Sequence, residues 1–438
     1  MSERTGLGID ELREVWWLLS SEDRLEGFRL LDAEEAEEFF NDLDPHDQAE
    51  LVLMLRTAEA RLWLRSLAPD DAVDLLQEVD EEERAGLLTL LDETTRREVT
   101  VLLAYEEDEA GGLMSSRFAR VRADMTVDEA VSYLRKQALA GVELETIYYV
   151  FVLAPDQTLL GIASFRDLFA APGARRVREV METDFVSVHE EMDQEEVARI
   201  FAEYDLLALP VVDDAGRMKG IVTVDDIVDV VEEEATEDAH KFGGLEALEQ
   251  PYLRTTFVDL IRKRAPWLII LFLGGNLTIV ALGSFEATIA ALPVLALLMP
   301  LIIASGGNSG SQASTLVIRA MAMDEVRLRD WWRVARRELA TGLVLGVMIG
   351  VLGFLRVVIF PPGDDASVSA TLVGITMGIS VIGVVLFGTL AGSMLPFLLK
   401  RVGLDPASAS APLVATMVDV TGLLIFFLTA SRLLSALL

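Results

Sequence analysis

The sequence predicts a multidomain membrane protein with an α-helical N-terminal domain, an α/β tandem repeat, an acidic connecting helix and a five-helix all-α transmembrane domain. Three observations support this prediction. The chain of 438 residues has 71 acidic and 37 basic side chains, but only nine of the acids follow Pro266. After that residue an apolar stretch long enough to span a bilayer occurs five times, and before it a short pattern recurs at an offset of 59 residues. An acidic, water-soluble half therefore precedes a nearly neutral, apolar half.

The composition excludes several functional classes. The chain has no cysteine, so a disulfide framework, a thiolate zinc site and a cysteine nucleophile are impossible. The net charge of -34 argues against nucleic-acid binding, which needs clusters of Lys and Arg. An intramembrane metalloprotease or another membrane enzyme remains an alternative, but all three histidines precede the spans and no His-Glu-x-x-His string exists. The sequence therefore predicts a protein that is not an enzyme.

The apolar half is expected to cross the membrane five times, because about 20 apolar residues span the hydrocarbon core. Six arginines between Arg319 and Arg337, the pair Lys400 and Arg401, and the bases at 262–264 lie in alternate connections. By the positive-inside rule, the acidic half is cytoplasmic and the C-terminus lies outside a cell (inner or plasma) membrane. No secretory signal is recognisable at the N-terminus. The predicted spans are 266–285, 288–318, 338–360, 368–399 and 412–435.

Polar residues within the spans mark the candidate pore. Residues 305–312 are too polar and glycine-rich to face lipid, so they are expected to line a cavity or another helix. Asp419 stands among apolar and small neighbours, and a carboxylate near the bilayer centre costs about 2.5 to 3.5 kcal/mol. We therefore take Asp419 as a functional candidate, with a protonated or hydrogen-bonded structural carboxyl as the alternative. The glycines spaced by four residues at 342–350 and 388–392 predict close helix contacts, within one subunit or between two.

The first 110 residues have the 3.6-residue apolar period of helices. Asp44 with Pro45, and Pro69 with Asp70, mark helix starts, which predicts a stack of short helix pairs. Residues 120–238 hold the repeat, in which 159–168 aligns with 218–227. Its Gly-Ile-x-Ser/Thr-x-x-Asp pattern resembles a tandem cystathionine-β-synthase-type (CBS) pair, a regulatory module whose clefts often take adenine nucleotides.

The resemblance to a CBS pair implies a possible ATP site. The nucleotide-binding positions it implies are Tyr149, Arg166, Asp167, Val186 and Leu206, with Asp226 equivalent to Asp167 in the second copy. Leu206 stands where an aromatic side chain would help to stack on adenine. The alternative is that both clefts are empty and purely structural.

A run of acids just before the first span is the strongest charge feature. Eight acids and no base lie between Asp225 and Asp238. On a helix, acids spaced by three and four residues repel one another, so such a segment attracts cations. Oxygen ligands without His or Cys favour magnesium or calcium. A solvated acidic linker is the alternative.

In this order, the parts resemble the MgtE family of magnesium channels over essentially the whole chain. The strings that support the resemblance are 105–114, 146–149, 234–238, 306–310 and 412–424. It implies a homodimer that takes Mg²⁺ into the cytoplasm and closes when Mg²⁺ binds between its acidic cytoplasmic domains. The implied domains are residues 1–112 (N-domain), 113–231 (CBS pair), 232–262 (connecting, or plug, helix) and 263–438 (pore domain).

The resemblance also implies a set of magnesium sites. In the pore these are Asp419 and the carbonyl of Ala415; in the cytoplasmic part they are Glu38, Asp70, Asp74, Glu195, Ala202, Asp205, Asp226, Asp229, Glu234, Glu237 and Asp238, the last three facing Asp405. Two positions depart from the family pattern, since Ala411 and Ser311 each stand where an Asn is expected. The same architecture conducting Co²⁺ or Mn²⁺ therefore remains an alternative.

Overall fold

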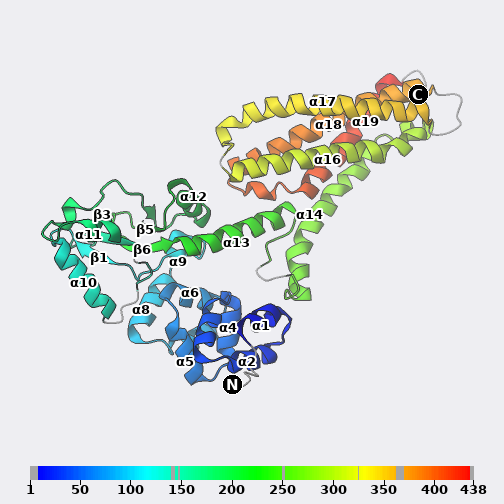
Figure 1. The fold of residues 1–438 in the computed structure, drawn as a ribbon. Coiled ribbons are helices and arrows are strands. Elements are labelled where there is room, and N and C mark those ends of the chain that lie inside the picture. The colour runs from blue at the N-terminus through cyan, green and yellow to red at the C-terminus, as the bar shows by residue number, and fades with distance from the viewer. Residues whose placement is uncertain are drawn as a thin grey trace. The chain divides into compact units, whose positions relative to one another are not determined.

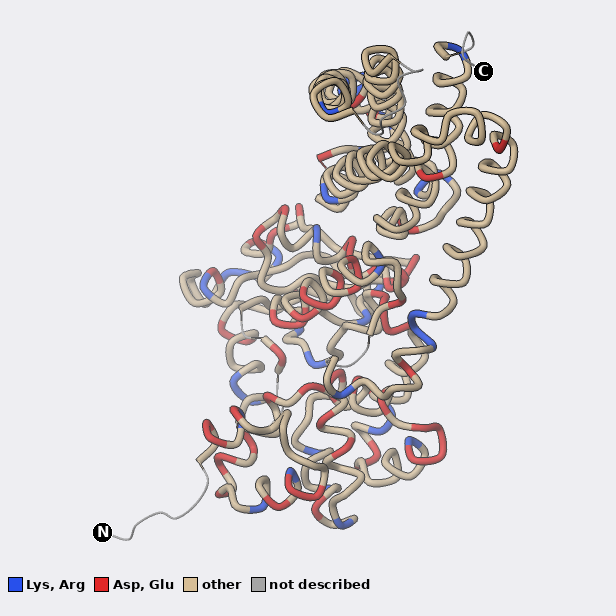
Figure 2. The backbone as a smooth tube through the Cα atoms, turned by 90° about the vertical axis from the view of Figure 1, so that its right-hand side faces the viewer, with Lys and Arg blue, Asp and Glu red and all other residues tan. Residues whose placement is uncertain are grey.

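The computed structural model describes residues 8–139, 144–146, 148–248, 252–323, 325–361 and 369–434. It divides into two compact units, Met1–Glu232 and Glu233–Leu438 (Figure 1). The first unit combines short helices with two small sheets, and the second contains long helices. This confirms the predicted fold class of helical domain, tandem α/β repeat and five-helix membrane domain. Acidic side chains are dense along the first unit and sparse along the membrane helices (Figure 2).

The N-terminal domain is a stack of short helices. Asp44 caps α4 and Pro45 occupies its first turn, while Pro69 and Asp70 open α6, as the sequence predicts. Alternate helices pack on one another, α2 on α4, α4 on α6 and α6 on α8. The elements are α1 (Ile9–Val15), η1 (Trp16–Leu18), α2 (Ser21–Leu30), α3 (Ala33–Asn41), α4 (Pro45–Met54), α5 (Thr57–Ser66), α6 (Pro69–Gln77), α7 (Glu81–Leu88), α8 (Glu93–Leu102) and α9 (Ala110–Leu113).

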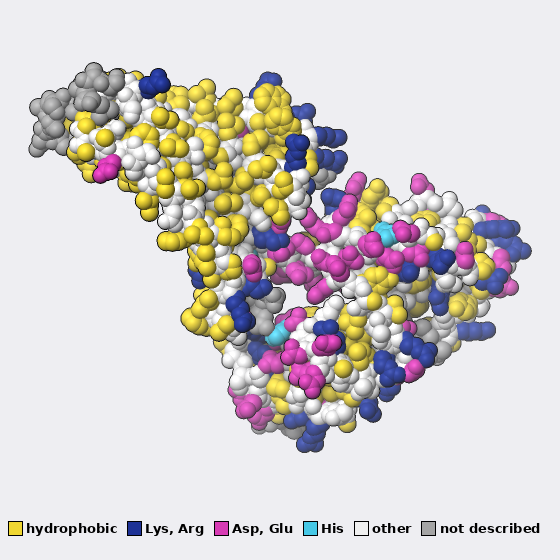
Figure 3. Space-filling view, turned by 180° about the vertical axis from the view of Figure 1, so that it is seen from behind, with side chains coloured by type: hydrophobic (Ala, Val, Ile, Leu, Met, Phe, Trp, Pro, Cys, Tyr) yellow, Lys and Arg dark blue, Asp and Glu magenta, His cyan; other side chains and the backbone are white. Residues whose placement is uncertain are grey.

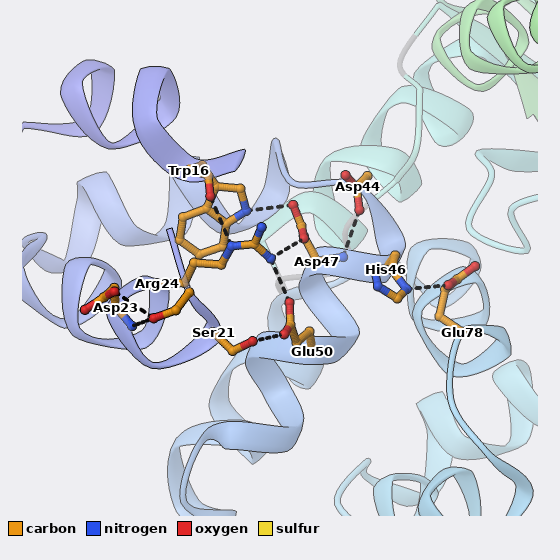
Figure 4. A network of polar contacts seen from close by, with 10 residues as sticks. Trp16, Ser21, Asp23, Arg24, Asp44, His46, Asp47, Glu50 and Glu78 are labelled. Carbon is orange, nitrogen blue, oxygen red and sulfur yellow. Dashed lines mark hydrogen bonds and ion pairs between the residues drawn. The ribbon is translucent and has the colours of Figure 1, made fainter. Parts of the chain in front are cut away.

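A buried ion pair joins the first helices of this stack (Figure 4). The Arg24 guanidinium lies 3.0 Å from Asp47 Oδ1 and 2.7 Å from Glu50 Oε2, and it covers the ring of Trp16. The indole N–H of Trp16 donates to Asp47 Oδ2 at 2.6 Å. Asp47 is only 2% exposed, so it needs these partners to be stable as an anion. The network therefore fixes η1, α2 and α4 as one block.

Each half of the tandem repeat contributes a three-stranded sheet of the same topology. In the first sheet β1 (Arg120–Arg122) pairs parallel with β2 (Tyr149–Leu153), which pairs antiparallel with β3 (Leu159–Ser164). In the second, β4 (Val188–His189), β5 (Ala208–Val212) and β6 (Met218–Thr223) repeat this order. Val152 faces Gly161 and Val211 faces Gly220, so the sequence offset of 59 is kept in the strand register.

Helices complete the two halves. α10 (Val127–Leu139) and α11 (Phe165–Ala170) belong to the first half, and α12 (Gln194–Tyr204) and α13 (Val224–Phe242) to the second, with a short turn η2 (Val177–Glu179) between them. The Ser164 hydroxyl donates to the Asp167 carboxylate at the start of α11, and the Thr223 hydroxyl donates to the Asp226 carboxylate in the same way at the start of α13. The aspartate of the repeated pattern therefore lies at a helix N-terminus in both copies.

The second unit has five helices that are long and apolar enough to cross a membrane, among the residues the structure describes. Its surface in Figure 3 is mostly hydrophobic, as expected for a face in contact with lipid. The helices are α14 (Phe257–Gly283), α16 (Val294–Ala322), α17 (Trp331–Ile359, preceded by η3, Leu328–Asp330), α18 (Ala370–Arg401) and α19 (Ala411–Leu433); the short elements are α15 (Glu286–Ala291) and η4 (Pro406–Ser408).

Several boundaries differ from the sequence prediction. The second span does not begin at residue 288, because α15 ends at Ala291 and α16 starts after Pro293. The segment 232–262 is not one connecting helix, since α13 ends at Phe242 and α14 begins at Phe257. Gly244, with φ +75°, follows the end of α13 and adopts a backbone conformation that glycine favours.

The glycine rows pack helices within one chain. A Cβ on Gly388 would lie 2.3 Å from the carbonyl oxygen of Gly306, and one on Gly392 only 2.0 Å from that of Gly310. On the other side of α18, Gly350 of α17 approaches the carbonyl of Gly378 in the same manner. Backbone therefore lies directly on backbone between α16, α17 and α18, which decides the sequence ambiguity in favour of contacts inside a subunit.

We expect Gly392→Ala to destabilise the membrane unit, because the added methyl group meets the backbone of α16, which cannot move aside as a side chain could. The expected cost is about 1 to 3 kcal/mol, seen as a lower midpoint of thermal unfolding in detergent. Gly275→Ala is the matched control, since a Cβ there has nothing within 4 Å. Equal midpoints for the two variants would contradict the close packing of α16 on α18.

Candidate functional site

The pore candidate Asp419 lies near the middle of α19. Ser410 caps this helix by accepting from the backbone N–H of Leu413, and Pro412 lies in its first turn. Ala415 is four residues before Asp419 and shares its face. Both side chains are partly exposed in the single chain. No hydrogen bond or ion pair reaches the Asp419 carboxylate from the described residues, so the structural alternative of a hydrogen-bonded carboxyl finds no partner there.

The polar stretch 305–312 forms part of α16 and has two kinds of surroundings. Gly306 and Gly310 pack against Val418 and Val414 of α19, and the buried Ser309 hydroxyl bonds to that of Thr389 at 2.7 Å. One side of this stretch of α16 therefore faces neighbouring helices, as predicted. Asn308 and Gln312 instead lie exposed on the chain. Since exposed amides are costly against lipid, this side of α16 requires a polar environment.

The two departures from the family pattern lie against each other. The Ser311 hydroxyl points to the carbonyl of Ala411 at 3.5 Å, the outer limit of a hydrogen bond. One turn further along α16, Ser314 donates to the carbonyl of Ala409 at 2.9 Å. Serine hydroxyls thus fasten α16 to the start of α19.

A lysine that sequence reasoning overlooked stands at the end of the acidic helix. Lys241 Nζ lies 2.7 Å from Glu237 Oε1 and 2.7 Å from Asp405 Oδ2. Burial lowers the pKa of Lys241, but these two hydrogen bonds and the charges of both carboxylates outweigh it and raise the pKa overall. Burial and the charge of Asp405 raise the pKa of Asp238. The predicted approach of Glu237 and Asp405 is present, but a lysine bridges them.

The first unit contains a second acidic cluster, formed by five carboxylates from three places in the chain: Asp70, Asp71, Glu145, Asp225 and Asp226. Asp70 is 7% exposed, and its Oδ1 has no hydrogen-bond partner among the described residues. Burial, followed by the charges of Glu145, Asp71 and Asp226, raises the pKa of Asp70 well above its usual value. Burial also raises the pKa of Asp226 to about 7, although hydrogen bonds from Thr223 act in the opposite direction.

Glu145 is a member of this cluster that the sequence did not suggest. It lies in a segment before β2, far from Asp70 and from Asp226 along the chain. Burial, together with the charges of Asp71 and Asp225, raises the pKa of Glu145. Only the tertiary fold brings the three acids together.

The remaining predicted magnesium ligands are spread over the first unit. Glu38 is exposed and pairs with Arg13 at 3.3 Å, beside Asp42. Asp74 follows Asp70 by one turn of α6 and is partly exposed. The remaining positions are exposed: Glu195 and Ala202 on α12, Asp205 directly after the end of α12, and Asp229 on α13. Within the described ranges, no three acidic or histidine side chains converge closely enough to hold a metal ion by themselves.

The predicted nucleotide positions fall into two groups. Arg166 and Asp167 are exposed at the start of α11, immediately after β3. Tyr149, Val186 and Leu206 are partly buried and pack against hydrophobic clusters of the first unit. The polar members are therefore accessible to a ligand, while the apolar members also serve the core.

Comparisons with known proteins agree with this arrangement. Family models match the divalent cation transporter MgtE at residues 299–429, the MgtE intracellular N domain at 7–108, and CBS domains at 110–173 and 177–233. The magnesium transporter MgtE of Thermus thermophilus is 44% identical over 429 residues, covering 97% of this chain and 93% of that protein. The magnesium transporter MgtE of Enterococcus faecalis is 31% identical and covers 97% of this chain and 94% of that protein.

A solved structure is also similar, that of the cytosolic domain of the Mg²⁺ channel MgtE in complex with ATP. It is 43% identical with a TM-score of 0.48, and the match covers 51% of this chain and 90% of that one.

Five apolar helices, together with an acidic intracellular region that contains a CBS pair, define a multi-pass membrane transporter for divalent cations. The chain belongs to the MgtE family of magnesium transporters. It is accordingly a magnesium transporter and not an enzyme.

Proposed function

We propose that this transporter is a homodimeric magnesium channel that is closed by magnesium binding to its acidic intracellular clusters. The observation that carries the proposal is the buried Asp70 carboxylate, which has an unsatisfied oxygen and three acidic neighbours, Asp71, Glu145 and Asp226. A buried anion surrounded by like charges is unfavourable unless a cation joins it. Carboxylate oxygens are the donors that magnesium prefers, so the chemistry of the cluster fits that ion.

The pore of the proposed dimer is lined by α19 and α16. Asp419, Asn308 and Gln312 are polar and lie within spans, and on the single chain Asn308 and Gln312 are exposed and Asp419 is partly exposed. Such side chains require a water-filled path or a second subunit beside them. Two Asp419 carboxylates at one depth would supply two negative charges, which match one partly hydrated divalent cation. Co²⁺ and Mn²⁺ carry the same charge, so this feature alone favours divalent ions and not magnesium in particular.

In the proposed gate, electrostatic repulsion between the acidic residues drives the N-terminal domain and the CBS pair apart. Without cations, Asp70 and Asp71 of α6 repel Glu145 and the start of α13, which favours separation of the N-terminal domain from the CBS pair. A bound divalent cation neutralises these carboxylates and turns repulsion into attraction. Moving a two-state gate through its range needs about 5.5 kcal/mol, which a few such contacts could supply.

α13 is the element that would carry this change to the pore. It is one continuous helix from Val224 to Phe242, with Asp225 and Asp226 in its first turn and Glu237 and Asp238 near its end. Phe242 packs against Ile318 of α16. A displacement at the start of α13 would therefore be felt at the helices that line the proposed pore.

Two further proposals concern ligands and topology. ATP is proposed to bind at the exposed Arg166 and Asp167 of the CBS pair, where a guanidinium suits a phosphate and a carboxylate suits a ribose hydroxyl. With an intracellular N domain and five spans, the C-terminus is proposed to lie outside the cell.

The experiment that tests the gate uses the fact that the pKa of Asp226 is raised and not lowered. Burial raises the pKa of Asp226 to about 7, above the ordinary value of 3.8. In the proposed gate the N-terminal domain supplies part of this burial, so the contact takes up a proton as it forms. In divalent-free buffer, the stabilisation of the contact by protonation of Asp226 is complete below about pH 4 and is lost as the pH rises through about 7. We expect the N-terminal domain to approach the CBS pair as the pH falls from 8 to 6, and also when Mg²⁺ is added at pH 8.

The distance can be read by spin labels, because the chain has no native cysteine. Leu62→Cys on α5 and Tyr133→Cys on α10 provide exposed positions in the two domains. Asp226→Asn should weaken the pH response, whereas Asp214→Asn, at an exposed turn, should leave it intact. A distance distribution that responds neither to pH nor to Mg²⁺ would contradict the proposed gate.

A further inference from the structure

A positively charged side chain of the protein itself, that of Lys241, lies among the acids at the end of α13. The Lys241 ammonium lies 2.7 Å from one oxygen of Glu237 and 2.7 Å from one oxygen of Asp405. Glu234 and Asp238 add their charges to the same neighbourhood. Lys241 is 26% exposed, so its charge is only partly screened by water.

Asp405 has no second free oxygen for another cation. Its Oδ1 accepts from the backbone N–H of Ala407 at 2.8 Å and so caps η4. Its Oδ2 is the atom that pairs with Lys241. An ion that binds both Asp405 and Glu237 therefore competes with the ammonium group for the same carboxylates.

We propose that Lys241 is a tethered counter-ion that competes with magnesium for Glu237 and Asp405, and so raises the magnesium concentration needed to hold α13 closed. The proposal rests on the proposed function, because it presupposes that magnesium acts on this helix. A lysine suits such a role, since its ammonium is a compact point charge on a flexible stem that can leave and return.

Charge gives the direction of the effect. Glu237, Asp238 and Asp405 together carry three negative charges, which Lys241 reduces to two. Removal of the ammonium leaves these carboxylates with more negative charge and with free oxygens, so a divalent cation binds them more tightly. If Lys241 were only a brace between α13 and the loop at Asp405, its removal would instead loosen the contact and raise the magnesium requirement. The two roles thus predict shifts of opposite sign.

The experiment titrates Mg²⁺ against full-length protein in lipid nanodiscs and measures protection from limited proteolysis after α13. For Lys241→Met we expect half-maximal protection at a Mg²⁺ concentration lower by about tenfold or more. Lys241→Arg keeps the charge and should remain within about threefold of the natural protein. Lys400→Met, which removes an exposed positive charge from the end of α18, is the matched control and should not shift.

A second readout is the binding of Mn²⁺, followed by electron paramagnetic resonance on the same proteins, which does not depend on transport. Tighter Mn²⁺ binding by Lys241→Met supports the competition. An unchanged or higher midpoint for Lys241→Met in a correctly assembled protein overturns it. If the natural protein itself shows no Mg²⁺-dependent protection, the proposed gate fails instead, so the two failures can be told apart.

Discussion

Replacement of Asp419 by alanine is expected to abolish magnesium uptake while the protein still folds and assembles. The side chain is partly exposed on α19, has no partner among the described residues, and is the sole acid of that helix. Without it, nothing on α19 compensates for the water that a divalent ion loses on entering the span. We expect at least about a hundredfold loss of uptake, which corresponds to about 2.7 kcal/mol.

The measurement is growth of a magnesium-auxotrophic strain together with ion flux into liposomes. Glu286→Ala is the matched control, because it removes an exposed carboxylate from the same membrane unit at the start of α15. It should retain uptake. Flux at the natural rate through Asp419→Ala would refute the assignment of this residue to the pore. Competition with Co²⁺ and Mn²⁺ in the same assay would also test the ion preference.

The second large effect is expected from the end of α13. Joint replacement of Glu234, Glu237 and Asp238 by alanine should give a channel that stays open at millimolar Mg²⁺. Asp238 and Asp405 repel each other, and Glu234 and Glu237 add to the charge around Asp238. The loss of the three acids therefore removes the charge on which the proposed closure depends. The Lys241 pair with Asp405 would survive, but it does not respond to magnesium.

Patch-clamp recording at increasing Mg²⁺ checks this expectation. The matched control replaces Glu81, Glu82 and Glu83 by alanine, which removes the same charge from an exposed first turn of α7. The control should close as the natural protein does. Current that still closes normally in the α13 variant would show that closure does not depend on these three acids.

Local patterns were sufficient to predict much of the fold. The helix starts at Asp44 and Pro69, the repeat offset of 59 and the five apolar stretches each depend on neighbours in sequence, and each has its counterpart in the structure. The ends of the spans were less predictable. α17 starts at Trp331, because charged residues continue a helix beyond the apolar stretch. The break before α16 comes from Pro293, a residue that apolar content alone does not single out.

The sites were harder to predict because they depend on long-range contacts. Glu145 joins Asp70 and Asp226 only through the tertiary fold, and Arg13 pairs with Glu38 from another helix. Lys241 was overlooked because the acidic run ends at Asp238 and its partner Asp405 is far along the chain. The sequence therefore showed where the acidic residues lie along the chain, but not which basic residues pair with them.

The contact of glycine backbones between α16 and α18 constrains how this protein can move. If one helix slid along the other, its neighbouring side chains would be pushed into the peptide groups of that helix. We therefore expect α16, α17 and α18 to move together as one rigid body. Any opening of a conduction path then involves α14 and α19, which take no part in the backbone contact, although Val414 and Val418 of α19 pack on Gly310 and Gly306. Spectroscopic probes for the motion are therefore best placed on those two helices.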